Sequence, residues 1–270
     1  MVPLTFLRKK ATRSVPLLLA ALIFAGCGTQ APDQSTAHLQ GSAQADSGFY
    51  LQQMSQSSND TKTNWQLLAI LLKEGKTQRA AELFNQLPKD LNDAQRREQS
   101  LLSAELKVAL KDYAAAKKSL GDIDVSALDK NQQARFWQAG ITAEQGRPSL
   151  TLLRALVAQE PLLGGADKQK NIDATWQALA SMTQEQAQAL VINADENVLQ
   201  GWLDLQRMWF DNRNDPTLLK AGVKDWQTRY PQNPGAKMLP TALVNMQNYK
   251  PASTNKIALF LPLNGQASIF

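Results

Sequence analysis

Two residue types in this chain of 270 residues commonly supply a nucleophile or a proton carrier, and each occurs once, as Cys27 and His38. A Ser-His-Asp triad or a zinc centre with histidine ligands needs a histidine that folded structure holds in place. His38 instead lies in a polar segment, residues 28–47, that has one leucine and no aromatic residue. Such a segment cannot bury enough apolar surface to fold. We therefore expect His38 to be solvated, with no catalytic or metal-binding role.

Carboxylates are the next candidates, because a pair of acids can hydrolyse glycans. Glu144, Glu160 and Glu185 are single acids in helical patterns, where we expect them to be solvated. The pair Gly164-Gly165 lacks the following Lys-Ser/Thr of a phosphate-binding loop. The sequence therefore predicts no catalytic, cofactor-binding or metal-binding residue, and no enzymatic activity.

The sequence before Cys27 has the pattern of a secretory signal. Four basic residues between positions 8 and 13 precede an apolar stretch, residues 15–25, that is too short to span a membrane. The stretch ends in Phe24-Ala25-Gly26-Cys27, which resembles the lipobox of bacterial lipoproteins, with Phe24 where the family usually has Leu. The resemblance implies that residues 1–26 are a signal peptide and that Cys27 carries acyl chains. The alternative is a plain cleaved signal with a chance cysteine.

The basic charge of the chain is concentrated in this signal. Residues 1–26 hold four of the 29 Lys and Arg residues and none of the 24 Asp and Glu residues, so the net charge falls from +5 to +1 beyond them. Nucleic-acid-binding proteins cluster basic residues on one face, whereas here both signs are interspersed. We expect no nucleic-acid partner. A single cysteine also excludes disulfides within the chain, so stability must come from burial.

Residues 27–46 are predicted to form a flexible lipidated tether. Its roughly 20 residues would span about 25 Å as a coil and about 65 Å when stretched. From residue 47 to 250, apolar residues recur at helical spacing. Helix starts are predicted after the cap residues Asn92, Asp129, Thr183, Asp215 and Asn233. This pattern predicts an all-α domain of about eleven or twelve helices. Four of these helices are each expected to present one apolar face. The residues on these faces are Trp65, Leu68, Ala69 and Leu72; Ala80, Leu83, Phe84 and Leu87; Leu102, Leu106, Ala109 and Leu110; and Tyr113, Ala116 and Leu120.

A weak repeat of about 35 residues runs through the first part of this domain. Residues 75–80 with Phe84 resemble the turn glycine, small residue and aromatic residue of a tetratricopeptide repeat. Residues 111–116 with Leu120, and residues 146–151, resemble the next two. The resemblance implies a tetratricopeptide-like superhelix, in which small residues let paired helices approach closely. Ordinary helix pairs of another α-fold are the alternative.

The pair Gly164-Gly165 interrupts the repeat, and four of the six tryptophans follow it. This change indicates a second helical subdomain. We interpret the tryptophans as core residues, and an exposed groove for a partner is the alternative. They are Trp176, Trp202, Trp209 and Trp226.

The composition changes again near the end of the chain. Residues 251–255 are predicted to be a linker, and residues 256–262 a buried strand. This strand resembles the opening strand of the type I periplasmic-binding-protein fold. We therefore expect residues 256–270 to be the start of such an α/β domain, which the chain does not complete.

The order of lipobox, tether, tetratricopeptide-like helices and apolar strand resembles the penicillin-binding protein activators of the LpoA type. These are outer-membrane lipoproteins of Gram-negative bacteria, and the resemblance covers the whole chain as their N-terminal part. It implies a lipid anchor on the periplasmic side of the outer membrane. It also implies activation of a bifunctional class A penicillin-binding protein, with the helices as spacer and interaction scaffold. Gly28 fits export to the outer membrane, because an aspartate there is the usual retention signal. No partner-binding residue can be carried over.

Other interpretations of a helical periplasmic protein stay open. A soluble lytic transglycosylase would also have an α-superhelix, but its catalytic Glu is followed by Ser, and no Glu-Ser pair occurs between residues 47 and 270. A tetratricopeptide lipoprotein scaffold of outer-membrane protein assembly would have no α/β domain after the helices. Capture of a small ligand by the domain that begins at Lys256 cannot be judged from one strand.

Overall fold

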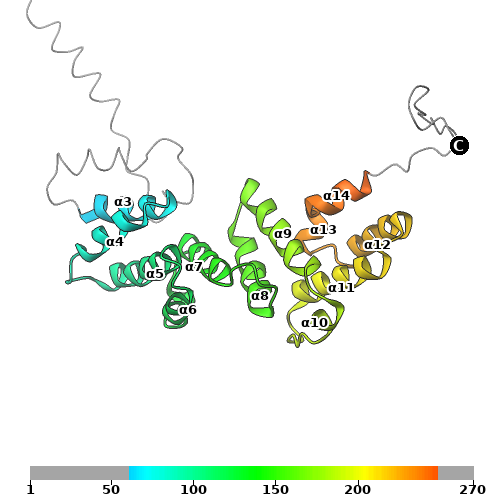
Figure 1. Cartoon of the computed structure of the whole chain (residues 1–270), viewed down its shortest axis with the longest axis horizontal. Coiled ribbons are helices and arrows are strands. Elements are labelled where there is room, and N and C mark those ends of the chain that lie inside the picture. Colours follow the sequence, from blue (N-terminus) through cyan, green and yellow to red (C-terminus); the bar gives the residue numbers. More distant parts are fainter. Residues whose placement is uncertain (1–60, 249–270) are drawn as a thin grey trace, which may run out of the picture. The chain divides into compact units, whose positions relative to one another are not determined.

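The computed structural model describes residues 61–248, which form helices joined by loops with no β-strand among them (Figure 1). The all-α expectation is confirmed for this range, and the strand predicted at residues 256–262 lies outside it. The chain divides into two compact units between Glu144 and Gln145. The division comes earlier in the chain than the Gly164-Gly165 pair at which the sequence indicated a second subdomain.

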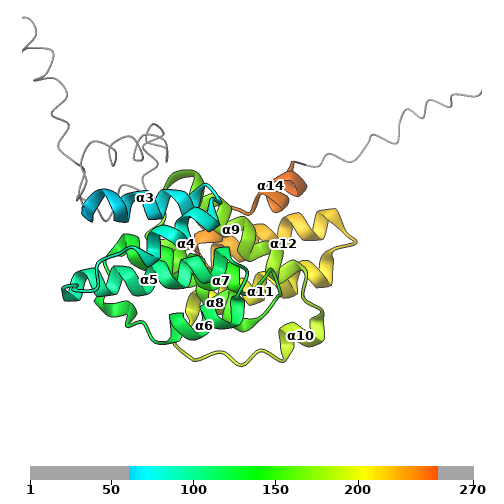
Figure 2. The same cartoon turned by 60° about the vertical axis from the view of Figure 1, so that its left-hand side comes forward.

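The first unit is built from helices that pack on their neighbours in the chain. Within its described residues, α3 contacts α4 and α5, α5 contacts α6 and α7, and α6 contacts α7 (Figures 1 and 2). The elements are α3 (Thr61–Lys73), α4 (Thr77–Asn85), α5 (Asp93–Ala109), α6 (Tyr113–Gly121), the 3-10 turn η1 (Val125–Ala127) and α7 (Lys130–Ala143).

Helix starts in both units follow the predicted cap residues. Asn92 accepts a hydrogen bond from the Gln95 backbone N–H at 2.8 Å, and the Gln95 side chain accepts one from the Asn92 N–H at 3.0 Å. This reciprocal arrangement satisfies two N–H groups that the first helical turn leaves without a partner. The cap residues predicted from the sequence and confirmed here are Asn92, Asp129, Thr183, Asp215 and Asn233.

A leucine-rich cluster joins α3, α4 and α5. On α3 the buried residues are Leu67, Leu68 and Leu71, whereas Trp65 and Leu72 of the predicted face pack at the margin of the cluster. The buried face of α3 differs from the predicted one because α3 contacts both α4 and α5 and turns its apolar residues toward both helices. The other buried members are Ala80, Leu83, Leu87, Leu102 and Leu106.

A second cluster lies on another face of α5. Leu101 and Ala104 are buried there, and the sequence pattern did not assign either of them to the core. Leu110, which the sequence placed on the apolar face, is 51% exposed because it is the C-cap residue beyond the end of α5. α5 therefore buries two faces, one in each cluster. The second cluster also contains Leu120, Leu128, Phe136 and Ala139.

The three predicted turns of the repeat adopt left-handed backbone conformations. Gly75, Lys111 and Gly146 have φ of 73°, 60° and 69°. After the first turn the Lys76 N–H donates to the Leu71 carbonyl at 2.8 Å, and after the second the Asp112 N–H donates to the Lys107 carbonyl at 2.9 Å. Both bonds close the preceding helix in the same way. Lys111 thus occupies a conformation that glycine adopts at lower cost.

The second unit continues the pattern of packing between near neighbours. Among its described residues, α8 and α9 contact each other and α11, α11 contacts α10 and α12, and α12 contacts α13 and α14. Its elements are α8 (Leu150–Gln159), η2 (Glu160–Leu162), α9 (Gly165–Ala180), α10 (Gln184–Gln188), α11 (Asn197–Asn212), α12 (Pro216–Arg229), α13 (Pro234–Lys237) and α14 (Thr241–Gln247).

Tryptophans form much of the core of the second unit. The rings of Trp202 and Trp226 are buried with centroids 6.1 Å apart, and Trp226 Nε1 donates to the Gly201 carbonyl at 2.7 Å. Trp176 is also buried, and the half-buried Trp209 meets it edge-on at 5.6 Å. The interpretation of these residues as core is therefore confirmed for Trp176, Trp202 and Trp226.

Candidate functional site

The residue to which the sequence assigns lipid attachment, Cys27, lies outside residues 61–248, as does His38. Lipidation at Cys27 and the solvated state of His38 therefore stay predictions.

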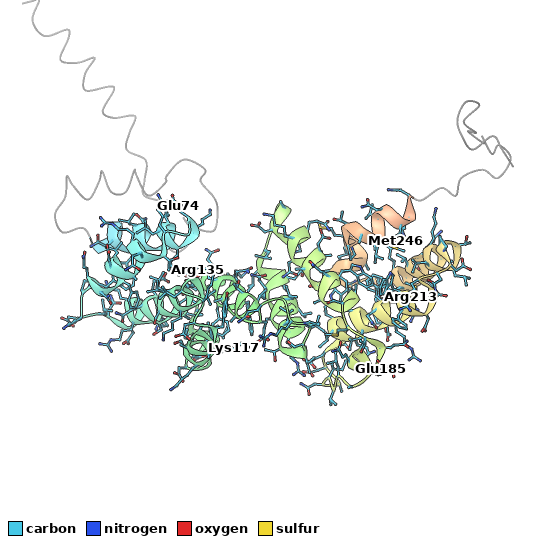
Figure 3. All side chains as sticks on the ribbon, in the orientation of Figure 1. Glu74, Lys117, Arg135, Glu185, Arg213 and Met246 are labelled. Carbon is cyan, nitrogen blue, oxygen red and sulfur yellow. The ribbon has the colours of Figure 1, made fainter. Side chains whose placement is uncertain are left out.

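The three acids considered for glycan chemistry lie on three separate elements. Glu144 Oε1 is 3.0 Å from Lys117 Nζ, and Glu160 Oε1 is 3.1 Å from Lys168 Nζ. Glu185 is exposed on α10 (Figure 3). The expectation that all three are solvated is wrong for Glu144 and Glu160, whose side chains are 12% and 10% exposed. Burial of the Glu160 carboxylate follows from the packing of η2 against both α8 and α9. Pairing of Glu144 and Glu160 with lysines is typical of structural ion pairs.

Neither a metal-binding cluster nor a membrane-spanning helix occurs within residues 61–248. In this range no group of three or more His, Cys, Asp and Glu side chains is arranged to hold a metal ion. No helix of the same range is both long enough and apolar enough to cross a membrane.

The strongest electrostatic feature of the first unit is a buried arginine between α7 and α5. The Arg135 side chain is 4% exposed, and its Nη1 lies 2.7 Å from Glu98 Oε1 (Figure 3). Its Nε donates to Glu105 Oε1 at 3.1 Å, and Nη2 donates to the same oxygen. Gln132 Nε2 donates to the other oxygen of Glu98 at 2.7 Å. The guanidinium therefore joins two carboxylates that are two helical turns apart on α5.

The charge of Arg135 is fixed by these neighbours. Burial acts to lower the pKa of Arg135, but the adjacent carboxylates of Glu105 and Glu98 outweigh burial and raise that pKa above its usual value. No sequence pattern predicts this cluster, because Arg135 is far from both acids in the chain. The only local signal is that Glu98 and Glu105 recur at the spacing of one helix face.

A second ion pair fixes the loop between α10 and α11. Arg154 Nε and Nη2 donate to the two carboxylate oxygens of Glu196 at 2.7 and 3.0 Å, and the Asn193 N–H donates to Oε2 at 2.7 Å. The bond from Arg154, with a smaller contribution from Asn193, holds the pKa of Glu196 below its usual value. Within this loop Val191 is 81% exposed. Apolar side chains presented by a fixed loop are candidates for contact with a partner.

Other exposed apolar side chains of the described residues lie on several elements. Among the large apolar side chains that are exposed within residues 61–248, only Leu110 belongs to the first unit. The others, besides Val191, are Leu218, Met238 and Val244. The candidate site is therefore a surface for contact with a partner, and Val191 is the side chain most suited to make that contact.

Comparison with known families identifies a match over most of the chain. The family model described as "LppC putative lipoprotein" matches residues 40–270.

Curated relatives match the whole chain. It is 79% identical over 272 residues to the penicillin-binding protein activator LpoA of Enterobacter sp. (strain 638), and the match covers 38% of that relative. It is 72% identical over 272 residues to the protein of the same name from Escherichia coli (strain K12), covering 40% of it. The chain thus spans about two fifths of the length of these relatives.

Solved structures match the helical region. The crystal structure of the E. coli LpoA amino terminal domain is similar with a TM-score of 0.75 and 67% identity, covering 81% of this chain and 99% of that one. Full-length LpoA from Haemophilus influenzae is similar with a TM-score of 0.70 and 26% identity, covering 87% of this chain and 44% of that one.

Proposed function

Because the chain belongs to the LppC lipoprotein family, we propose that it is the amino-terminal part of an envelope lipoprotein that activates a penicillin-binding protein. The observation that carries this proposal is the identity of 72 to 79% with relatives named penicillin-binding protein activator LpoA. The remainder of the protein would follow residue 270.

The partner in this proposal is a bifunctional class A penicillin-binding protein of the inner membrane. The protein would be held on the periplasmic side of the outer membrane by acyl chains on Cys27, with residues 27–46 as tether. Support comes from the lipobox-like sequence that ends at Cys27 and from Gly28 after it. Anchored there, the protein would reach through the peptidoglycan to stimulate glycan polymerisation and peptide cross-linking.

The helical region, residues 47–250, would be a tetratricopeptide-like superhelix that acts as spacer and interaction scaffold. Support comes from the packing of each helix on its near neighbours and from the left-handed turns at Gly75, Lys111 and Gly146. Residues 251–255 would be a linker to an α/β domain that begins at residue 256.

The proposed role is regulatory and does not include catalysis by this region. Relatives over the whole chain are named activators, and the acids suited to glycan hydrolysis lie on separate elements. The relatives' names also favour this role over a lytic transglycosylase or a scaffold of outer-membrane protein assembly.

The activator role is tested with the purified full-length protein and a class A penicillin-binding protein. Glycan polymerisation and cross-linking are measured with and without the activator, and we expect both to increase. Absence of stimulation across a range of activator concentrations would contradict the proposal.

The spacer role is tested in cells. Deleting residues 61–248 while keeping the anchor and the rest of the protein should abolish activation, because the effector part would no longer reach the synthase. Replacing the deleted residues with an unrelated helical rod of similar length is the matched control, and it should restore activation at least in part. Unchanged activation in the deletion strain would show that reach is not required.

A further inference from the structure

The last described helix, α14, packs against α12 and is hydrogen-bonded to α9. It has seven residues, of which Leu243 is buried and Val244 is 37% exposed. Helices this short are not stable alone in water, so α14 depends on what it contacts. Its N-cap residue, Pro240, provides no side-chain cap.

A carboxylate from another helix supplies the missing cap. Asp173 of α9 accepts a hydrogen bond from the Thr241 N–H at 2.8 Å through Oδ1 and one from the Thr241 hydroxyl at 2.8 Å through Oδ2. Gln169, one turn earlier on α9, donates to Asp173 Oδ1 at 2.9 Å and to the Leu239 carbonyl at 3.1 Å. The residues on both sides of Pro240 are thus bound to α9 by two side chains.

The preceding helix, α13, is held in a different way. Gly235 lies against the buried ring of Trp202, the Asn233 side chain donates to the Val198 carbonyl at 3.0 Å, and Gln227 donates to the Ala236 carbonyl at 3.2 Å. Close packing therefore fixes α13. Residues 238–240, which connect α13 to α14, are not helical.

We propose that α14 is a releasable helix, which docks and undocks together with Leu239 and Pro240; Asp173 and Gln169 of α9 hold it in the docked position, and the exposed, non-helical Met238 is its hinge. Segments with few buried side chains open more easily than the protein core, and within α14 only Leu243 is buried. The chain continues beyond residue 248, so release of α14 changes the position from which the rest of the protein leaves the helical region. This consequence rests on the proposed function, in which an effector domain follows, whereas the docking equilibrium does not.

Amide hydrogen exchange of the chain from residue 28 tests whether α14 is releasable. We expect Asp173→Ala to speed the exchange of α14 about tenfold to a hundredfold, because hydrogen bonds to a charged group are lost. α8, α11 and α12 should keep their wild-type exchange. Thr241→Val removes the hydroxyl bond and keeps the backbone bond, so it should have a smaller effect of the same kind. The control is Asp225→Ala, because Asp225 is exposed on α12 and pairs with Arg229.

Two results would overturn the proposal. One is unchanged exchange of α14 in Asp173→Ala. The other is faster exchange of all helices of the second unit together, which would make Asp173 a general stabiliser.

A distance measurement keeps the test decisive if Asp173→Ala folds poorly. Spin labels at the exposed positions Gln177 on α9 and Asn245 on α14 should give one narrow distance distribution in the chain from residue 28, which has no cysteine of its own. Thr241→Val should broaden it, and an unchanged distribution would contradict the release of α14. Neither measurement uses a synthase, so the release of α14 and the activator role can fail independently.

Discussion

Arg135 is the residue whose loss should destabilise the first unit most through electrostatics. Arg135→Ala leaves Glu98 and Glu105 close together without their shared cation, in a site that only partly reaches solvent. Removing one partner of a buried ion pair costs about 3 to 5 kcal/mol, and because both carboxylates are partly exposed we expect about 3 kcal/mol here. Urea unfolding of the chain from residue 28 measures this loss.

The matched control for Arg135 is Arg96→Ala. Arg96 lies on the surface of α5, 3.6 Å from Asp93, and its loss should change the free energy of unfolding by less than about 0.5 kcal/mol. Equal effects of the two variants would show that burial of Arg135 does not matter. Arg135→Lys should be intermediate, because an ammonium cannot match the fork geometry of the guanidinium.

The ion pair of Glu196 with Arg154 should make the free energy of unfolding depend on pH in the acid range. Its pKa in the folded protein lies below the ordinary value of 4.5, chiefly because of the hydrogen bond from Arg154. The resulting stabilisation is complete above that value and is lost as the pH falls through the folded pKa. Arg154→Ala should therefore make the free energy of unfolding fall less steeply between about pH 5 and pH 3.

The measurement is urea unfolding at a series of pH values. Arg79→Ala serves as control, because it removes an exposed arginine that pairs with Glu82 at 3.5 Å and leaves the Arg154–Glu196 pair in place. Parallel pH profiles for the wild type and Arg154→Ala would contradict the assignment.

At the residue scale, the sequence predicted contacts that are local and missed those that are not. The pairing of Asn92 with Gln95 spans three positions in the chain, so the sequence pattern indicates it directly. The pairing of Arg135 with Glu98 and Glu105 depends on how α7 folds back onto α5, which no local pattern encodes. The burial of Glu160 was misjudged for the same reason, since it follows from the packing of η2 between α8 and α9.

At the scale of elements, the close packing of α13 against Trp202 predicts that a methyl group added at Gly235 destabilises the second unit. A Cβ on Gly235 would contact Trp202 Cη2 and lie 2.9 Å from Cζ3, and the ring is buried and cannot move aside. Overpacking of this kind costs about 1 to 3 kcal/mol, so Gly235→Ala should destabilise the second unit by about 2 kcal/mol. Thermal unfolding measures this loss.

Gly140→Ala is the control for Gly235. Gly140 lies inside α7, and a Cβ there meets no heavy atom within 4 Å. Alanine is the better helix former, so this variant should gain about 0.5 to 1 kcal/mol. Destabilisation by both substitutions would show that the contact with Trp202 is not the cause.

The ends of helices and the positions of turns were predicted better than the faces that the helices bury. Cap residues and the glycines at positions 75 and 146 located element ends, because these signals act within one turn. The helical period alone omitted Leu101, since the period assumes one buried face and α5 has two. It also assigned Leu110 to the core, although α5 ends one residue before it. The number of faces is set by how many neighbours a helix has.

At the scale of the whole molecule, the anchor predicted at Cys27 is tested by fractionation of cells. Cys27→Ser removes the only thiol to which acyl chains can attach, so the full-length protein should leave the membrane fraction. His38→Ala is the control and should stay in that fraction, because the histidine is expected to be solvated. Recovery of Cys27→Ser in the outer membrane would contradict the anchor.

The order of segments in the sequence indicated the family, whereas the division between Glu144 and Gln145 was not foreseen. The sequence signals for a subdomain were the glycine pair and the tryptophans. The contacts that define the two units depend instead on which helices share a core.

Packing between near neighbours also bears on how the chain reaches its folded state. The principal contacts of α3 to α7 join helices at most two steps apart, so little chain entropy is lost before each contact forms. During synthesis the N-terminal part of a chain is free to fold first. The first unit can therefore condense while later helices are still being synthesised, which shortens the time during which leucine-rich faces are open to aggregation or proteolysis.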